Sequence, residues 1–446
     1  MSSYCAIDFG TSNSAIAIPT EQGMRLVPLE GDSTTMPTAV FYCTDVDDLP
    51  TGVEKATGRP GAELPRAFGR AAVQAYIEGY EGRLMRSMKS ILGSPLVDQT
   101  TDLGHGFGVK YIDIITGYLH HLRSRAERTG GQVLSHVVLG RPVFFVDDDP
   151  ERDAQAQASL AAAAHAVGFK EVAFQYEPIA AAFDYEQQAT REELALVADI
   201  GGGTSDFSVV RVGPQRAALL DRRSDILANH GVHVAGTDFD RRVSLSCVMP
   251  PLGHGGVGPS IGGQAPRPVP SRVYFDLATW HLINNIYQAP RVAELKSMNG
   301  FYADQTQFKR LMKVVNDRLG HALVGSAEAA KIAVAAGGDF DIDLSVIEAG
   351  LHSPLKEAQA EQAFREDLSR ITASALETVR MAGLKPSDIH ALYFTGGSTG
   401  MKLLTDQLEA AFPETRAVRG DRLASVATGL GLHAGRLFGS QVRGPV

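Results

Sequence analysis

The sequence is poor in the residues that hold a disulfide-stabilised fold or a metal cluster together. Only three cysteines occur among 446 residues, at Cys5, Cys43 and Cys247, and none belongs to a Cys-x-x-Cys pair. Scattered cysteines of this kind exclude a disulfide framework and predict a cytoplasmic protein, because the cytoplasm keeps thiols reduced. The 13 histidines show no His-Glu-x-x-His spacing, so the sequence does not indicate a zinc site.

Long apolar runs and an excess of positive charge are missing as well. No apolar stretch approaches the roughly 20 residues that a membrane helix needs, and no basic stretch followed by an apolar run marks a signal peptide. The net charge of −9 argues against binding to nucleic acid or to an anionic membrane surface. The dipeptide Gly-Lys does not occur, which excludes a P-loop.

Two short segments of the chain carry nearly the same pattern. Residues 6–12 and 198–204 each have an apolar run, then an aspartate (Asp8 or Asp199), then a glycine turn with threonine or serine, and a second apolar run follows. The pattern predicts two strands joined by a tight turn. Glycine lets successive backbone N–H groups converge on an anion, whereas an aspartate beside a phosphate requires a divalent cation between them. The repeated pattern therefore indicates two lobes that close on one Mg²⁺-nucleotide.

Strands and helices alternate along the chain and predict an α/β protein with sheets covered on both faces. The two halves follow one plan, with strands and helices predicted at 4–18, 133–139, 150–166, 172–176, 179–185, 194–212, 364–381 and 391–395. This order predicts an internal duplication of the topology. The stretch 250–270 is dense in glycine and proline, so we expect an irregular loop there.

Two further glycine motifs match those of other enzyme classes. Residues 253–258 fit the dinucleotide fingerprint Gly-x-Gly-x-x-Gly, but they follow two prolines and open no helix, so they do not indicate a dinucleotide site. Residues 396–400 fit the Gly-x-Ser-x-Gly elbow of serine hydrolases, with His433 downstream as a triad candidate. Too few strand–helix units follow for that fold. The alternative is a glycine turn at a helix N-terminus that binds an anion or a nucleotide.

Together these motifs resemble the nucleotide-binding domain of the DnaK-type heat-shock protein 70 family. In chain order they are residues 6–14, Lys89 ahead of an Ile-Leu-Gly sequence, and residues 177–182, 199–206, 236–240, 326–331 and 394–399. The resemblance implies the actin-like ATPase fold, an α/β fold of two duplicated lobes around a central nucleotide cleft. The implied divisions are lobe I at 1–190, with its core at 1–40 and 111–190 and an inserted subdomain at 41–110, and lobe II at 191–446, with its core at 191–230 and 361–446 and an inserted subdomain at 231–360.

The resemblance also implies roles for individual residues. Asp8 and Asp199 would hold Mg²⁺ through water. Lys89 and Glu177 would place the attacking water, Asp206 would accept its proton, and Thr204 would contact the γ-phosphate. The residues that would bind the nucleotide are Gly10, Thr11, Ser12, Asn13, Gly201, Gly202, Gly203, Thr204, Gly236, Glu328, Lys331, Gly396, Gly397 and Ser398.

The sequence departs from the family pattern at three positions and at its end. Ile332 and Gly400 stand where the family has two arginines that sandwich the adenine, which predicts weaker or different base stacking. Tyr176 stands where the family has asparagine. The sequence stops at Val446 and shows no acidic-leucine linker and no β-sandwich domain for unfolded peptides. We therefore expect a nucleotide-binding domain without a substrate-binding domain, as in short bacterial DnaK-like proteins.

The resemblance implies a slow ATPase that acts as a chaperone-related molecular switch, with ATP or ADP and Mg²⁺ as cofactors and K⁺ as a further candidate ion. The expected partners are an unidentified protein partner or client and a nucleotide-exchange factor, with no nucleic acid and no membrane. Two alternatives remain open, a small-molecule kinase of the same fold and a non-hydrolysing nucleotide-binding scaffold. A kinase needs a general-base carboxylate beside an acceptor pocket, whereas Lys89 and Glu177 favour water as the acceptor. The missing arginines favour the scaffold.

Overall fold

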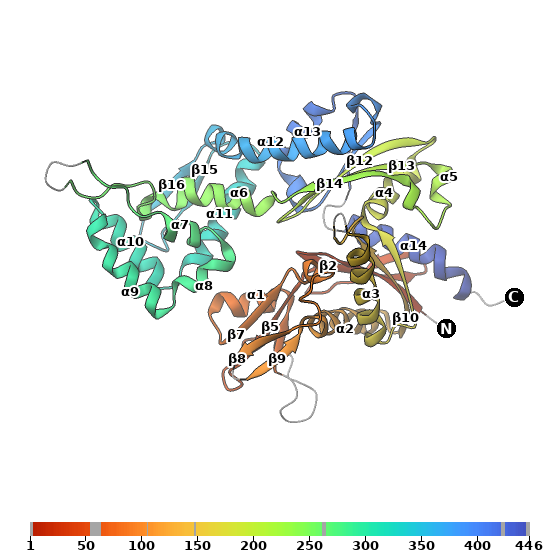
Figure 1. Cartoon of the computed structure of the whole chain (residues 1–446), viewed down its shortest axis with the longest axis horizontal. Helices are drawn as coiled ribbons and strands as arrows, with labels where there is room; N and C mark the ends of the chain where they lie inside the picture. Colours follow the sequence, from red (N-terminus) through yellow and green to blue (C-terminus); the bar gives the residue numbers. More distant parts are fainter. Residues whose placement is uncertain are drawn as a thin grey trace.

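The chain folds into two α/β bodies, which we call lobe I and lobe II, each built on its own sheet (Figure 1). The computed structural model describes residues 3–53, 64–104, 106–146, 149–260, 265–420 and 424–442. Lobe I occupies the lower part of Figure 1 and lobe II the upper part. Within the described ranges, none of the helices combines the length and the apolar character that crossing a membrane requires.

The main sheet of lobe I has six strands. Its order is β11-β10-β1-β2-β3, with β4 paired to β2. Strands β1, β10 and β11 run parallel to one another, whereas β2 is antiparallel to β1 and β3 is antiparallel to β2. The bounds are β1 (Ser3–Phe9), β2 (Asn13–Thr20), β3 (Gly23–Leu26), β4 (Thr35–Pro37), β10 (Leu134–Arg141) and β11 (Glu171–Tyr176).

The main sheet of lobe II repeats this plan with five strands in the order β14-β13-β12-β17-β18. Strands β12, β17 and β18 are parallel, and β13 and β14 complete an antiparallel meander. The bounds are β12 (Glu193–Ile200), β13 (Ser205–Val212), β14 (Ile226–Val232), β17 (Ala391–Thr395) and β18 (Arg416–Arg419).

The predicted duplication of topology is confirmed by these two strand orders. Strand β1 corresponds to β12 and β2 to β13, so Asp8 and Asp199 are each the second-last residue of the first strand in their sheet. Both strands lead through a glycine turn into an antiparallel partner. The same backbone geometry therefore delivers one carboxylate from each lobe to the same end of its sheet.

Two helices pack between the sheets, α4 (Glu177–Gln188) and α14 (Ser425–Val442) (Figure 1). Helix α14 packs against α4 and against β1, β2 and β10 of lobe I. The two helices approach closely, because a Cβ on Gly429 would overlap the backbone of Ala180. The alanines of α4 lie buried in the core that joins the two sheets. Small residues therefore form the close contact between α4 and α14.

The remaining helices cover the sheets or belong to segments inserted between the sheet strands. In lobe I, α2 and α3 pack on the core that contains β1 and β2. The helix bounds are α1 (Gly69–Glu78), α2 (Tyr111–Gly130), α3 (Pro150–Val167), α5 (Pro214–Ala217), α6 (Gly236–Val243), α7 (Arg272–Leu277), α8 (Ile283–Ile286), α9 (Ala289–Ser297), α10 (Gln305–Asn316), α11 (Gly320–Ala335), α12 (Glu357–Met381) and α13 (Lys402–Ala411).

The inserted segments form small sheets of their own. In lobe I the three-stranded sheet β6-β5-β7 and the hairpin β8-β9 lie between the main-sheet strands β4 and β10 along the chain. In lobe II β15 pairs with β16. The bounds are β5 (Ala39–Cys43), β6 (Arg66–Phe68), β7 (Gly82–Arg86), β8 (Thr100–Gly104), β9 (Phe107–Lys110), β15 (Phe340–Asp343) and β16 (His352–Leu355).

The expected irregular loop at 250–270 is more ordered than its composition suggests. A 3₁₀ turn spans Pro250–Leu252, and the backbone N–H of Gly258 donates to the carbonyl of Arg267 at 2.7 Å. Val257 and Pro268 form an antiparallel bridge. Residues 261–264 lie outside the described residues. Two backbone segments of this loop therefore pair with each other, although its glycine and proline content predicted an irregular structure.

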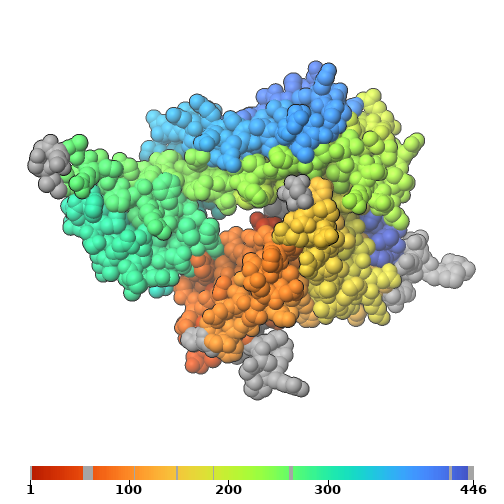
Figure 2. Space-filling model, viewed as in Figure 1, coloured from red at the N-terminus to blue at the C-terminus, as the bar shows by residue number. Residues whose placement is uncertain are grey.

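The insertions of the two lobes meet through aromatic and charged side chains. The ring centroid of Trp280 in lobe II lies 4.9 Å from that of Tyr76 in α1, with the two rings tilted by 30°, and the guanidinium of Arg86 lies 4.4 Å from the Trp280 centroid. His321 contacts both rings edge-on, and its Nε2 lies 3.1 Å from Asn284 Oδ1. Figure 2 shows these parts touching, orange against green, beside a hollow in which red N-terminal residues are visible. The lobes therefore touch at the outer end of the hollow.

Candidate functional site

The glycine turns after β1 and β12 face each other across the space between the lobes. A Cβ on Gly10 would overlap the carbonyl of Asn13, so this tight turn requires glycine. A Cβ on Gly202 would lie 3.4 Å from the hydroxyl oxygen of Ser12 in the other lobe, whereas a Cβ on Gly203 would have open space around it. The two loops predicted to bind phosphate are thus brought together.

Two further segments of lobe II are tied to the second loop. The backbone N–H and the hydroxyl of Thr237, at the start of α6, both donate to the carbonyl of Gly202 at 2.8 Å. The hydroxyl of Ser398 donates to the carbonyl of Gly201 at 2.6 Å. Gly396 adopts a φ of 87°, and a Cβ there would overlap the carbonyl of Ile200, so the turn needs glycine. The segments that begin at Gly201, Gly236 and Gly396 therefore form one connected surface.

Lys89 and Glu177 form a buried ion pair in lobe I. Lys89 lies in the 3₁₀ turn Met88–Ile91 after β7, and its ammonium donates to Glu177, the first residue of α4. The two side chains are 9% and 16% exposed. A Cβ on Gly140 would lie 3.1 Å from Glu177 Oε1, so the carboxylate rests on a position without a side chain. The pair thus holds a lysine and a carboxylate in fixed positions.

The electrostatics of the site show an excess of negative charge. Burial, together with the charges of Glu177 and Asp199, raises the pKa of Asp8 to about 8. Burial and the charges of Asp206 and Glu177 raise the pKa of Asp199 to about 7. Burial and the charge of Glu177 also raise the pKa of Asp206, although its hydrogen bond with Thr204 acts to lower it.

The pKa of Lys89 shows the same excess of negative charge. Burial acts to lower its pKa, but Glu177, Asp8 and Asp199 outweigh this and raise it. One lysine therefore faces four carboxylates, and a divalent cation would relieve their mutual repulsion. Among the described residues, no three side chains of His, Cys, Asp or Glu are grouped so as to hold a metal ion directly. This donor set fits Mg²⁺, which keeps several of its waters and takes one or two carboxylates.

We predict that Mg²⁺-ADP binds more tightly as the pH rises from 6 to 8.5. The raised pKa values of about 8 for Asp8 and about 7 for Asp199 mean that the free protein holds protons there at pH 6. Binding to a divalent cation needs the charged carboxylates, so it releases protons. Calorimetry in buffers of different ionisation enthalpy measures this release. Affinity that is constant with pH, or proton uptake on binding, would contradict the assignment of the two carboxylates.

The nucleoside end of the predicted site lies on α11. Lys331 Nζ is 2.7 Å from Asp240 Oδ1 and 3.4 Å from the carbonyl of Gly236, which ties α11 to α6. Burial raises the pKa of Asp240, and the charge of Glu328 adds to this rise. Glu328 lies on the same helix as Lys331 and is exposed. The side chain of Ile332 is 60% exposed. The structure thus gathers these residues around α6, with an exposed apolar side chain beside them.

The structure reveals contacts that the sequence analysis did not assign. Asp240 is the ion-pair partner of Lys331, and Thr38 bonds to the first phosphate loop from 28 residues away. Asp240 is the last residue of the 236–240 motif, so the sequence held a visible signal for its contact with Lys331. No local pattern pointed to the contact of Thr38. His433, the triad candidate of the hydrolase alternative, is buried and hydrogen-bonded to Gln175 at 3.2 Å, so it serves no triad with Ser398.

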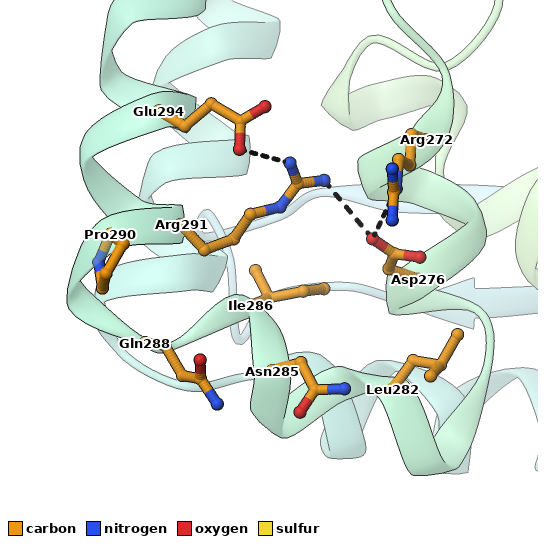
Figure 3. A pocket seen from close by; sticks show the side chains of 9 residues that line it. All are labelled: Arg272, Asp276, Leu282, Asn285, Ile286, Gln288, Pro290, Arg291 and Glu294. Carbon is orange, nitrogen blue, oxygen red and sulfur yellow. Dashed lines mark hydrogen bonds and ion pairs between the residues drawn. The ribbon is translucent and has the colours of Figure 1, made fainter.

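A separate cavity of about 510 Å³ lies in lobe II between α7, α8 and α9 (Figure 3). Figure 3 shows the guanidinium of Arg291 between Glu294 and Asp276, and both ion pairs are formed, at 2.5 and 3.3 Å. Arg272 faces the same carboxylate of Asp276 at 3.9 Å. None of the residues predicted to bind nucleotide lines this cavity. For this reason the cavity is not part of the candidate site, and its charged side chains are paired with one another.

The duplicated sheets, the facing glycine turns and the aspartate at the end of each first strand define the class of the protein. This is the actin-like ATPase fold, as the sequence predicted. A family model described as "Hsp70 protein" matches residues 4–248, which is more than half of the chain. The chain belongs to the Hsp70 family.

Individual relatives agree with this family at low identity. The chain is 25% identical over 445 residues to "Chaperone protein HscA homolog" of Shewanella baltica strain OS155, an alignment that covers 98% of this chain and 58% of that protein. It is 24% identical over 444 residues to "Chaperone protein DnaK" of Thermosipho melanesiensis, covering 98% of this chain and 59% of that protein. The chain therefore spans less than two thirds of the length of these chaperones.

Proposed function

We propose that the protein binds Mg²⁺-ATP between its lobes and hydrolyses it slowly, as a nucleotide-operated switch related to the Hsp70 chaperones. One observation carries this proposal: the buried Lys89–Glu177 pair lies among Asp8, Asp199 and Asp206, next to two facing glycine turns. Glycine turns suit phosphates, the carboxylates suit a hydrated cation, and the fixed ion pair suits a positioned water. Members of the family to which the chain belongs are ATPases.

In this proposal Asp8 and Asp199 would hold a hydrated Mg²⁺ beside the phosphates. That ion, when bound, neutralises charge that develops on the transferred phosphoryl group. Thr11, Ser12, Asn13 and the backbone of residues 201–203 hold the β- and γ-phosphates, and Thr204 contacts the γ-phosphate. Glu328, Lys331, Gly236 and residues 396–398 hold the nucleoside from lobe II.

Lys89 and Glu177 orient the attacking water in line with the bond that breaks. Asp206 accepts the proton of that water, and its raised pKa brings it closer to neutrality, where a general base works best. The chain itself forms no covalent bond in this scheme. Its contribution is positioning and electrostatic stabilisation, which dominate catalysis of phosphoryl transfer.

The first test is phosphate release from ATP by the wild-type protein. We expect slow release that needs Mg²⁺, because without the cation four carboxylates repel the triphosphate. Chelation with EDTA is expected to reduce release to the background of the buffer, and added Mg²⁺ to restore it. Release that is unaffected by EDTA would contradict the proposal.

The same assay separates the two alternatives. A kinase would form ADP faster when a panel of sugars or small acids is added, without a matching rise in free phosphate. A scaffold would bind ATP tightly by calorimetry and release no phosphate over hours. The exposed Ile332, which offers no guanidinium to stack on a base, is the observation that favours the scaffold.

We further propose a cytoplasmic location and a protein partner or client that senses the nucleotide state. The three cysteines are buried and free, which suits a reducing compartment. A nucleotide-exchange factor and a bound K⁺ remain proposals that rest on the family relationship.

A further inference from the structure

Three buried hydroxyl groups lie beneath the first phosphate loop, and no step of the proposed reaction uses them. Ser14 on β2, Thr38 between β4 and β5, and Tyr118 on α2 are 1%, 2% and 0% exposed. The Tyr118 hydroxyl donates to the carbonyl of Pro37 at 3.0 Å. This bond fixes the backbone next to Thr38 against helix α2.

Thr38 holds the phosphate loop at both of its ends. Its hydroxyl donates to the carbonyl of Gly10 at 2.8 Å, and its backbone N–H donates to the carbonyl of Ser12 at 2.9 Å. Ser14 Oγ lies 2.8 Å from Thr38 Oγ1. A threonine hydroxyl has one hydrogen, and here Gly10 takes it, so Thr38 accepts its second bond from Ser14. Removing this hydroxyl would leave both the Gly10 carbonyl and the Ser14 hydroxyl without that partner.

The same residue begins the segment that carries Lys89. Strand β5 starts at Ala39 and pairs with β7, with Ala39 opposite Arg86. The chain passes from Arg86 directly to the 3₁₀ turn that holds Lys89. The phosphate loop belongs to the six-stranded sheet and Lys89 to the extension of the three-stranded sheet. Thr38 is thus hydrogen-bonded to the phosphate loop and is followed directly by the strand that pairs with the segment carrying Lys89.

We propose that Thr38 is a positioning residue, whose hydroxyl keeps the first phosphate loop in register with Lys89. The inference rests on the proposed nucleotide site, and it adds a residue that touches neither the nucleotide nor the water. Without the hydroxyl, the Gly10 carbonyl is free to turn toward solvent, and the loop is no longer preorganised for phosphate. A lost preorganised contact of this kind costs roughly tenfold in rate or affinity.

The test compares Thr38→Val, which keeps the shape and removes the hydroxyl, with Thr38→Ser, which keeps the hydroxyl. Thr378→Val is the matched control, because Thr378 is fully buried and its hydroxyl donates to a carbonyl at the same 2.8 Å, within helix α12. For each variant the thermal midpoint, the affinity for Mg²⁺-ADP by calorimetry and the single-turnover rate of phosphate release are measured.

We expect T38V to lose roughly tenfold in both affinity and single-turnover rate, and T38S to stay within about threefold of wild type. T378V is expected to lower the thermal midpoint as T38V does, with affinity and rate unchanged. Equal affinity and rate in T38V and T378V, or a T38S variant as impaired as T38V, would overturn the role of Thr38. If T38V does not fold, Thr38→Cys takes its place, since a thiol is a weak donor, and a Cys variant equal to T38S overturns the role.

The binding measurement keeps this inference separate from the proposed hydrolysis. A wild-type protein that binds Mg²⁺-ADP but releases no phosphate would refute the ATPase, while the affinities of the Thr38 variants would still decide the role of Thr38. A wild-type protein that binds no Mg²⁺-ADP would overturn both.

Discussion

Replacing Asp199 with asparagine is expected to abolish phosphate release and, at the same time, to stabilise the nucleotide-free protein. The activity falls because one of the two carboxylates proposed to hold hydrated Mg²⁺ is lost, and we expect a drop of at least about 10³-fold. The nucleotide-free fold is stabilised because burial and neighbouring charges oppose the ionisation of Asp199, whose pKa is about 7, yet at pH 8 this carboxylate is charged. Each unit by which the pKa is raised costs roughly 1.4 kcal/mol of stability. The folded-state pKa lies about 3 units above the ordinary value of 3.8, so we expect a gain on the order of 4 kcal/mol in the free energy of unfolding at pH 8.

The size of this gain depends on pH, which gives the experiment an internal check. The folded-state pKa of Asp199 lies above its unfolded value of 3.8, so the folded protein binds more protons between pH 4 and 7. Its stability therefore decreases as the pH rises through this window, and the asparagine variant removes that contribution. Chemical denaturation at pH 5 and pH 8 measures both. Asp317→Asn is the control, since that carboxylate is 48% exposed and paired with Lys313. Destabilisation of D199N at pH 8 would contradict the charge excess.

Replacing Lys89 with methionine is expected to abolish phosphate release and to destabilise the fold, the opposite effect on stability. Lys89 is buried and its ammonium is bonded to Glu177, so methionine leaves Glu177 buried without its cation beside Asp8 and Asp199. Breaking one side of a buried ion pair costs roughly 3–5 kcal/mol. The measurement is denaturant unfolding in the absence of nucleotide, together with single-turnover phosphate release.

Two further variants separate the ion pair from general damage to the fold. The double variant Lys89→Met with Glu177→Gln removes both charges and is expected to recover most of the stability but none of the activity. Lys402→Met changes an exposed lysine paired with Asp406, and its effect is expected to stay below about 1 kcal/mol. If the double variant is no more stable than the single one, the buried pair is not the cause of the loss.

The parts of the site that could be predicted from the sequence are those encoded in short local patterns. An apolar run, an aspartate and a glycine turn placed Asp8 and Asp199 at strand ends, because strand geometry and glycine turns depend on neighbouring residues. The strand at 391–395 has the predicted bounds. Helix α3 begins at the predicted residue 150, where Asp149 caps it, and ends at Val167, one residue beyond the predicted 166.

The parts that escaped prediction depend on pairing between distant segments. Strands β5 to β9 are short and were not predicted individually, since short strands are defined by their partners more than by their own composition. The bond from Thr38 to Gly10 spans 28 residues, and nothing in either local sequence announces it. The pairing of Gly258 with Arg267 is hidden for the same reason, because glycine and proline content says nothing about backbone partners.

The position of Trp280 has a consequence for observing the molecule. It is the single tryptophan of the chain, and its ring contacts Tyr76 and Arg86, each about 200 positions away from it in the sequence. Tyr76 and Arg86 come from one lobe and the indole from the other, so separation of the lobes must change the surroundings of the only indole chromophore. A change in the emission spectrum of Trp280 would therefore report a separation of the two halves without an attached dye.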